Sequence, residues 1–344
     1  MENFNTLLKL PNLKEKVFQT ASFKIGIRSA LKTILIFSSL LFITCPAFAQ
    51  DSNILHPIKE LEQKLQREPF EIFRIRAARF EGDMTKRAIL KWADGIPIQV
   101  KWKRAARGGW AVNNQPRYEI AAYELQKLFL EPGEYVVPPT VGRSLPVDEY
   151  QEIEANVRPT FKNTKCVFFC LQYWLEEVTS KEIYDKKRFK SDTTYAKHLG
   201  NMNILSYLIK HNDSNEGNFL ISKDPGNPRV FAVDNGLAFG NLESDRGFEW
   251  RTIRVKSLPG KTIERLRKIQ KTDLVKTLGV VAQFQILQGQ LIPVSAGESL
   301  NDRKGVRVSE KMVQFGLTKA EINGVFNRIK KLLKRVDSGK IKTF

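Results

Sequence analysis

The alternation of apolar and polar positions predicts several short strands in the first part of the chain. Residues 72–80 and 87–92 are strand-like, and so is "IPIQVKWKRA" at 96–105. The Asp94-Gly95 pair stands between the last two runs, where it favours a tight hairpin turn. An apolar and aromatic run at 165–175 has the length and composition of a buried strand. We therefore expect a β-sheet here, with two of its strands joined by a hairpin.

Helical patterns accompany and follow these strands. Residues 56–68 read as a short amphipathic helix, and residues 118–130 as a helix that ends at Pro132-Gly133. The next segment, "YVVPPTV", is expected to be extended because proline disfavours helical conformation in the residue before it. Apolar residues recur at helical spacing between 195 and 209, which predicts a core helix.

The last helix has the clearest pattern and a defined beginning. Thr318 and Glu321 have the spacing of a capping box, in which each side chain bonds the other residue's backbone N–H. The positions after them form one apolar stripe at helical spacing: Ile322, Val325, Phe326, Ile329, Leu332, Leu333 and Val336. We expect the C-terminal part of the chain to be mainly helical.

Together these elements predict an α+β fold with two lobes and a cleft between them. Residues 50–175 are expected to form a small β-rich N-lobe with an N-terminal helical extension. Residues 176–344 are expected to form a larger helical C-lobe that ends in a basic helical part. The chain of 344 residues is long enough for both, and it contains no internal repeat.

Residues 24–50 have the features of an export signal. Basic residues precede an apolar run at 33–45, and the A-x-A pattern of a cleavage site follows at 47–49. The apolar run is too short to favour a membrane-spanning helix, and the A-x-A pattern disfavours an uncleaved anchor. We therefore expect residues 1–49 to be a leader and signal peptide. The protein is then exported to a periplasm, a secretory lumen or the outside of the cell.

The formal charge of +19 is concentrated near the C-terminus. Residues 251–344 hold 21 Lys and Arg against 7 Asp and Glu, whereas the central region is nearly neutral. An anionic partner is therefore expected to meet the C-terminal third, either an acidic substrate or an anionic membrane surface. A solvated positive face is the alternative. Nucleic acid is not expected, because no basic strand has interleaved stacking aromatics.

After removal of the leader, only Cys166 and Cys170 remain, so the chain has no disulfide framework. In a strand these two residues lie about 13 Å apart and cannot be bridged, whereas a helix or a tight turn would allow a disulfide. The sequence leaves both arrangements open.

The stretch "IKHNDSNEGNFLISKDPGNPRVFAVDNGLAFG" at 209–240 concentrates polar residues around two short apolar runs. Asn218 precedes the first run and Asp234 follows the second, with an Asp-Pro-Gly-Asn turn between the runs. In an antiparallel hairpin these two residues lie side by side, and Asp213 stands in the loop before them. Two oxygen ligands beside a further carboxylate suit a hard divalent cation, Mg²⁺ or Mn²⁺, shared with phosphate oxygens.

The same residues have the spacing of a kinase catalytic loop. Asp213 lies five residues before Asn218, and this is the interval between the Asp that accepts a kinase substrate's proton and the Asn that binds metal. Asp234-Asn-Gly stands where a second metal-binding Asp is found. A polar hairpin of turn-forming residues is the alternative. The fitting length of the hairpin and the "DNGLAFG" ending favour a kinase-like site that binds ATP and metal.

Phosphate transfer also needs a cation from the N-lobe. Lys101 and Lys103 follow the predicted hairpin turn and point the same way from the strand, so the sequence does not choose between them. Glu119, at the start of the following helix, is the expected ion-pair partner, with Glu124 as the alternative. The alternative is that these Lys and Glu side chains are exposed surface charges, which is their usual state. No G-x-G-x-x-G loop is present, and Glu-Gly-Asp at 81–83 is the candidate turn over the phosphates.

The chain resembles the atypical secretory-pathway kinases, which include the Golgi casein kinase, the glycosaminoglycan xylosylkinase and the four-jointed kinases. "EIAAYELQKLF" followed by "VVPPTVGR" is similar to the family's helix with the ion-pair Glu and the strand after it, and "VDNGLAFG" resembles its metal-binding segment. The resemblance covers residues 75–240, and Asn218 stands where the family has an acidic residue. It implies a bilobal protein-kinase-like fold, with Lys101 as nucleotide lysine, Glu119 as its partner, Asp213 as catalytic residue and Asp234 as metal ligand.

The same stretch also resembles the type II phosphatidylinositol 4-kinases, which are cytosolic and membrane-associated. "YLIKHNDSNEGNFLI" and "VDNGLAF" are similar to their catalytic loop and metal segment. The export signal and the "VPPTVGR" strand favour the secretory kinases. The sequence therefore predicts an exported kinase that transfers the γ-phosphoryl group of ATP to a hydroxyl on a protein or glycan. A lipid kinase is the second prediction, and a pseudokinase or anionic-ligand-binding module the third.

Overall fold

The structure, a computed structural model, describes residues 51–76, 84–240 and 247–344. These residues belong to one compact unit. The expected leader at 1–49 and the end of the first expected strand, at 77–80, lie outside the described residues. Among the helices of the described ranges, none has the length and apolar character needed to cross a membrane.

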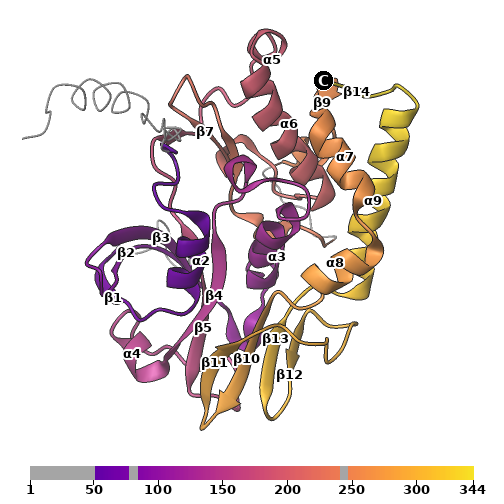
Figure 1. Cartoon of the computed structure of the whole chain (residues 1–344). Coiled ribbons are helices and arrows are strands. Elements are labelled where there is room, and N and C mark those ends of the chain that lie inside the picture. Colours follow the sequence, from indigo (N-terminus) through magenta and orange to yellow (C-terminus); the bar gives the residue numbers. More distant parts are fainter. Residues whose placement is uncertain (1–50, 77–83, 241–246) are drawn as a thin grey trace, which may run out of the picture. The chain divides into compact units, whose positions relative to one another are not determined.

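A five-stranded antiparallel sheet lies in the first part of the chain (Figure 1), with the strand order β1-β2-β3-β5-β4. Its strands are β1 (Glu71–Arg76), β2 (Thr85–Lys91), β3 (Pro97–Arg104), β4 (Thr140–Pro146) and β5 (Cys166–Tyr173). The predicted hairpin at Asp94-Gly95 joins β2 to β3, and Gly95 has the positive φ of 80° that such turns require. Every residue of β5 is buried, as its apolar run predicted.

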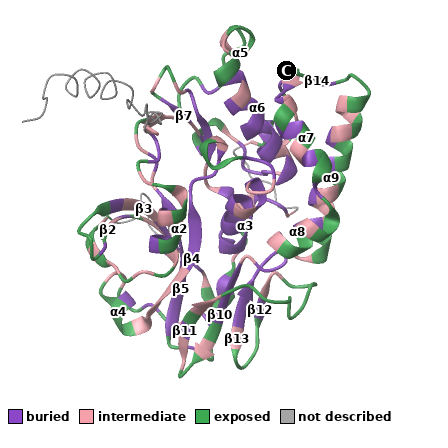
Figure 2. Cartoon of the chain, in the orientation of Figure 1, coloured by how far each residue is buried: buried purple, intermediate pink, exposed green. Residues whose placement is uncertain are grey.

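Two helices accompany this sheet. The first is α2 (Ile58–Gln66), and the second is α3 (Pro116–Gln126), which begins with proline at its first position. Nearly every residue of α3 is buried (Figure 2). The helix contacts β4 and β5, and it also contacts α8 (Lys271–Leu278) and the turn after β8, at Asn235–Leu237. Helix α3 is therefore enclosed by segments that precede residue 176 (β4 and β5) and by segments that follow it (α8 and the turn after β8).

The long core helix predicted between residues 195 and 209 is α6 (Thr193–Leu208). The Asp192 carboxylate accepts the Tyr195 N–H at 2.9 Å and so caps its first turn. A small antiparallel sheet in the order β6-β7-β8 lies beside it. The other elements of this region are β6 (Val178–Thr179), α5 (Arg188–Ser191), β7 (Phe219–Ser222) and β8 (Val230–Ala232), whereas α4 (Val147–Gln151) contacts β4 and β5 of the large sheet.

The C-terminal part is not mainly helical, so that prediction is wrong. Residues 282–315 form a four-stranded antiparallel sheet in the order β11-β10-β13-β12. Phe284 alternates with Gln283 and Gln285 at the two-residue period of a strand, and Gln288-Gly289 have φ of 53° and 84°, as a two-residue hairpin turn requires. The four strands of this sheet are β10 (Ala282–Leu287), β11 (Gln290–Val294), β12 (Val306–Val308) and β13 (Met312–Phe315). Two further strands, β9 (Ser257–Leu258) and β14 (Lys342–Thr343), pair with each other in a separate parallel sheet.

Helices α7 (Gly260–Lys268), α8 and α9 (Lys319–Asp337) complete this region. The predicted capping box of α9 is present: Thr318 N–H donates to Glu321 Oε2 at 2.7 Å, and Glu321 N–H donates to Thr318 Oγ1 at 3.3 Å. The C-terminal sheet packs against β5, where the rings of Phe168 and Phe315 stack with centroids 4.1 Å apart.

Cys166 and Cys170 both lie on β5 as free, buried thiols. Of the two arrangements that the sequence left open, the structure therefore has the strand, in which residues four apart are too distant for a disulfide.

Mild acid should destabilise the fold through His198 in α6. Burial, with Arg229 and Lys197 nearby, lowers the pKa of this imidazole from 6.5 to about 4. Between these pH values the unfolded chain binds a proton at His198 and the folded chain does not, so the free energy of unfolding falls as the pH falls. We expect His198 to contribute about 3 kcal/mol to this loss, measured by urea unfolding at pH 7 and pH 4. The loss in His198→Gln should be smaller by about this amount, and an equal loss in that variant would contradict the assignment.

Candidate active site

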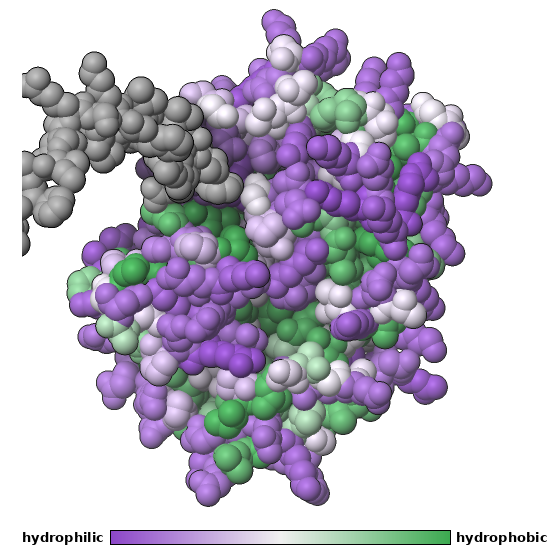
Figure 3. Space-filling model, in the orientation of Figure 1, coloured by the Kyte–Doolittle hydropathy of each residue, from purple (hydrophilic) through white to green (hydrophobic). Residues whose placement is uncertain are grey.

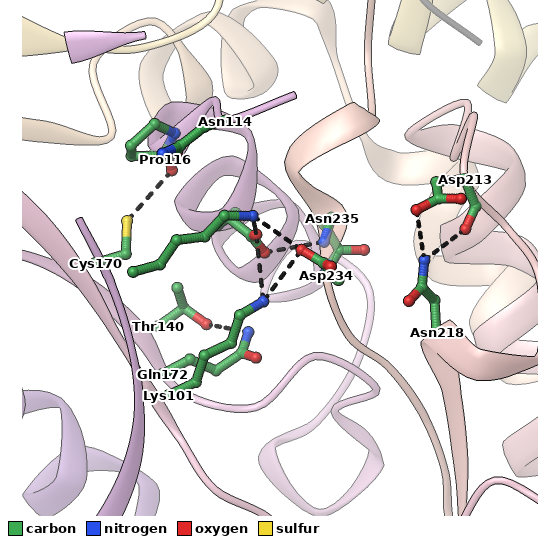
Figure 4. Close-up of polar contacts among 12 residues, drawn as sticks. Lys101, Asn114, Pro116, Thr140, Cys170, Gln172, Asp213, Asn218, Asp234 and Asn235 are labelled. Atoms are coloured by element: carbon green, nitrogen blue, oxygen red, sulfur yellow. Dashed lines mark hydrogen bonds and ion pairs between the residues drawn. The ribbon is translucent and has the colours of Figure 1, made fainter. Parts of the chain in front are cut away.

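The hairpin of β7 and β8 places the predicted loop residues at one end of the small sheet. The two strands are antiparallel, and the Val233 N–H donates to the Asn218 carbonyl oxygen at 2.9 Å. Asn218 and Asp234 therefore stand at the ends of neighbouring strands, as the sequence predicted. Their side chains have different partners: Asn218 binds Asp213, whereas Asp234 binds two lysines (Figure 4).

Asp213 is held in place by two amide side chains. Asn218 Nδ2 donates to the Asp213 Oδ2 at 2.9 Å and to its carbonyl oxygen at 2.7 Å, and Asn215 Nδ2 donates to Oδ1 at 2.9 Å. Asp213 and Asn218 are both buried. Each carboxylate oxygen of Asp213 has a fixed donor and further lone-pair capacity, so the group is oriented to accept a proton from another molecule.

Asn212, the residue before Asp213, fixes this loop to the segment after Asp234. The Asn212 N–H donates to the Leu237 carbonyl at 3.1 Å, and its Nδ2 donates to the Gly240 carbonyl at 3.0 Å. His211 is fully buried, and burial lowers the pKa of its imidazole, which keeps it neutral at pH 7. Asn212 therefore supports the position of the loop through its two hydrogen bonds.

Lys101 and Lys103 of β3 both reach the site, because residues two apart in a strand share a face. Lys103 Nζ lies 2.9 Å from Asp234 Oδ1 and 3.1 Å from Glu119 Oε1. Lys101 Nζ lies 3.2 Å and 3.5 Å from the same two oxygens. The sequence left open which lysine reaches the site, and the structure places both there. Lys103 is the closer and more buried of the two.

Glu119 joins α3, β3 and the segment after β8 at one point. Its side chain is 3% exposed, and it pairs with both lysines through Oε1. Its second oxygen accepts the Asn235 N–H at 2.9 Å. Glu124, the alternative partner, binds Lys127 at 2.7 Å instead.

Asp234 is charged and conformationally constrained. Lys101 and Lys103 hold the pKa of its carboxyl well below the usual range, against the opposing effect of burial. Its backbone has φ of 55° and ψ of 53°, in the left-handed region that residues other than glycine seldom adopt. Such conformations concentrate at ligand-binding and catalytic sites.

A small cavity behind the lysines is lined by residues that sequence reasoning missed. Thr140, Cys170 and Gln172 line it together with the two lysines and Glu119. Gln172 Nε2 donates to Thr140 Oγ1 at 2.9 Å, which satisfies the buried amide. Gln172 is the amide residue in the otherwise apolar and aromatic run of β5, and this was the signal that the sequence contained.

The oxygen atoms at the hairpin end fit a cation that binds together with phosphate. In the described ranges, no three acidic, His or Cys side chains converge closely enough to hold a metal by themselves. Asn218 and Asp234 offer an amide and a carboxylate oxygen from neighbouring strand ends. Mg²⁺ and Mn²⁺ accept such small protein ligand sets and complete their coordination with phosphate and water. The turn at 81–83, expected over the phosphates, lies outside the described residues.

Replacement of Lys103 should destabilise the protein more than replacement of Lys101. Lys103→Met leaves the buried Glu119 with Lys101 as its lysine partner, at 3.5 Å. Lys101→Met keeps the shorter ion pair between Lys103 and Glu119, at 3.1 Å. Removing one partner of a buried ion pair costs about 3–5 kcal/mol, and the remaining lysine should reduce this to about 2 kcal/mol for Lys103→Met. Urea unfolding of both variants measures the difference. Equal losses of unfolding free energy in the two variants would contradict the stronger pairing of Lys103 with Glu119.

Comparison with protein-family models and with curated proteins finds no match. Among solved structures, the chain is similar to the MAP kinase LmaMPK10 from Leishmania major, with a TM-score of 0.28 and 13% sequence identity. The aligned part covers 52% of this chain and 49% of that kinase, so it spans about half the length of the structure it matches. A likeness of this size establishes neither a family nor an activity, and the case for a function rests on the contacts of the site.

Proposed function

We propose that the protein is an exported atypical kinase with a bilobal, protein-kinase-like fold, which transfers the γ-phosphoryl group of ATP to a hydroxyl on a protein or glycan. The observation that supports this most strongly is the meeting of Lys103, Glu119 and Asp234 at one point, beside the Asp213–Asn218 pair. Protein kinases place a lysine on the third strand, its glutamate on the next helix, and metal-binding Asp and Asn residues after them. Here the equivalent groups stand on β3, on α3 and at the end of the β7–β8 hairpin.

Each of these residues has a task in the proposed reaction. Lys101 and Lys103 bind phosphate oxygens, and Glu119 holds the two ammonium groups in place. Asn218 and Asp234 would hold Mg²⁺ or Mn²⁺, and the bound cation would supply positive charge for the phosphoryl oxygens. Asp213 orients the acceptor hydroxyl and accepts its proton. Positioning and charge stabilisation then supply most of the rate enhancement.

The acceptor follows from charge and from the predicted export. A signal peptide at 1–49 would deliver the enzyme to a compartment that contains secreted proteins and glycans. The excess of Lys and Arg in residues 251–344 attracts acidic substrates.

A lipid kinase is the second candidate, and the surface of α7 and α9 favours it. These two helices contact each other and expose several lysines, and hydrophilic side chains cover much of the face on which they lie (Figure 3). Such a surface also binds an anionic membrane, at about 1 kcal/mol for each Lys or Arg near the bilayer.

One assay distinguishes these functions. The protein is incubated with γ-labelled ATP and Mn²⁺ or Mg²⁺, with an acidic protein, a glycosaminoglycan fragment and phosphatidylinositol vesicles as parallel acceptors. Label on protein or glycan is the expected result, and label on lipid would favour the second candidate. Metal-dependent ATP binding without transfer to any acceptor would identify a pseudokinase or an anionic-ligand-binding module.

A further inference from the structure

An ion pair joins α3 to the helix near the other end of the chain. Arg117 Nη1 donates to Glu321 Oε2 at 2.7 Å and Nη2 donates to Oε1 at 2.8 Å, the two-point geometry of a strong Arg–carboxylate pair. The Tyr118 O–H donates to the same carboxylate. Arg117 and Tyr118 are buried, and the guanidinium lies 4.0 Å from the Tyr118 ring centroid. We call Arg117, Tyr118 and Glu321 the C-terminal clamp.

The backbone around the C-terminal clamp leaves a fitted space for the guanidinium. Arg117 Nη1 also donates to the Gly316 carbonyl at 3.2 Å. Gly305 lies so close that an added Cβ would stand 2.4 Å from Arg117 Cζ, so a larger residue there would displace the arginine. Arg307, itself 3% exposed, donates to the Leu317 carbonyl at 2.9 Å and holds the backbone next to Gly316.

Glu321 is fixed by its own helix as well as by α3. Its Oε2 accepts the Thr318 N–H at 2.7 Å in the capping box of α9. Burial alone would raise the pKa of Glu321, but the hydrogen bonds from Arg117 and Tyr118 lower it below its ordinary value. The carboxylate is therefore charged at neutral pH and held from two sides.

Arg117 and Glu119 project from opposite sides of α3, because residues two apart are rotated by about 200° around a helix axis. Glu119 contacts the lysines of β3, and Arg117 contacts the C-terminal part of the chain. Tyr118, between them, packs against Phe239 with ring centroids 5.5 Å apart. A rotation or shift of α3 that separates Glu119 from Lys103 must therefore also disturb the C-terminal clamp.

We infer that Glu321 is a positioning residue for phosphoryl transfer: through Arg117 it holds α3 where Glu119 reaches Lys103. The inference rests on the proposed function, because it gives Glu321 a part in that reaction. The C-terminal segment thereby completes the active site from the side of α3 that faces away from the lysines. The inference goes beyond the proposed function because Glu321 is assigned no contact with ATP, metal or acceptor and yet affects the reaction.

Glu321→Gln tests this inference, with Glu154→Gln as the matched control. Glutamine keeps the shape of the side chain and can still accept the capping-box bond, but it removes the charge that Arg117 binds. Glu154 forms a similar two-point pair with Arg104, at 2.8 Å and 3.1 Å, and Arg104 points from β3 to the face opposite Lys103. The two variants therefore lose comparable ion pairs at different places.

We expect Glu321→Gln to lower kcat per folded molecule at least about 10-fold, since small misplacements of catalytic groups are costly. KM for ATP should change less than about 2-fold, because the lysines remain. Amide hydrogen exchange of α3 should be faster than in Glu154→Gln, and Arg117→Lys should recover part of the rate that Arg117→Met loses. Equal kcat in the two glutamine variants, or unchanged exchange of α3, would overturn the inference. An inactive wild-type protein would overturn the proposed function instead.

Discussion

Asp213→Asn is expected to lower kcat about 1,000-fold, within the range that a positioned proton acceptor contributes. Asparagine has the same shape and can still accept one of the amide hydrogen bonds, so the loop should keep its conformation. What is lost is the basic oxygen that Asn218 and Asn215 orient. The affinity for ATP should stay unchanged, because Asp213 is assigned to the acceptor hydroxyl rather than to the nucleotide.

The appropriate measurement is steady-state transfer of γ-phosphate, combined with a separate titration of ATP binding. Asp224→Asn is the matched control, since Asp224 lies in the turn of the same hairpin, where its carboxylate accepts the Gly226 N–H at 2.9 Å and the Ser52 O–H at 3.5 Å, both outside the site. A loss of less than about 10-fold in Asp213→Asn would mean that another group accepts the proton.

The second large effect is expected for Asp234→Asn. This change weakens the metal ligand and removes the charge shared by Lys101 and Lys103. Loss of a metal or an oriented charge that stabilises the phosphoryl group costs several kcal/mol, so kcat/KM for ATP should fall on the order of 100-fold or more. The Mn²⁺ or Mg²⁺ concentration needed for half-maximal rate should rise as well.

Metal titrations of the transfer rate measure this effect. Asp94→Asn serves as control, because Asp94 also binds a lysine, Lys64, but at the turn between β2 and β3. An unchanged metal dependence in Asp234→Asn, with the rate reduced, would show that Asp234 acts on the lysines alone and would remove it from the metal site.

Much of the site could be predicted because its signals are local. The strand period places Lys101 and Lys103 on one face, and the hairpin places Asn218 beside the end of β8. The sequence could not choose between the lysines, and the structure shows that Glu119 and Asp234 lie within reach of both. The side-chain directions of Asn218 and Asp234 were not predictable, because each depends on a partner supplied by another element.

The missed sheet at 282–315 and the missed ion pair between Arg117 and Glu321 have equally specific causes. The strands at 282–315 are only three to six residues long, and glutamine alternates with apolar residues clearly in β10 alone, so their two-residue period is easily overlooked beside the strong stripe of α9. The pairing of Arg117 with Glu321 joins residues 204 positions apart, and no periodicity indicates such a contact. The glycine at 305 that makes room for it is equally unmarked in the sequence.

The most direct test of the central claim is a calorimetric titration of the purified protein with ATP, in the presence and absence of Mg²⁺ or Mn²⁺, repeated with Asp234→Asn. If the β3 lysines and the hairpin end form a nucleotide site, ATP binds when the cation is present, and binding is strongly weakened without the cation or in the variant. Absence of ATP binding to the wild-type protein with either cation would contradict the account.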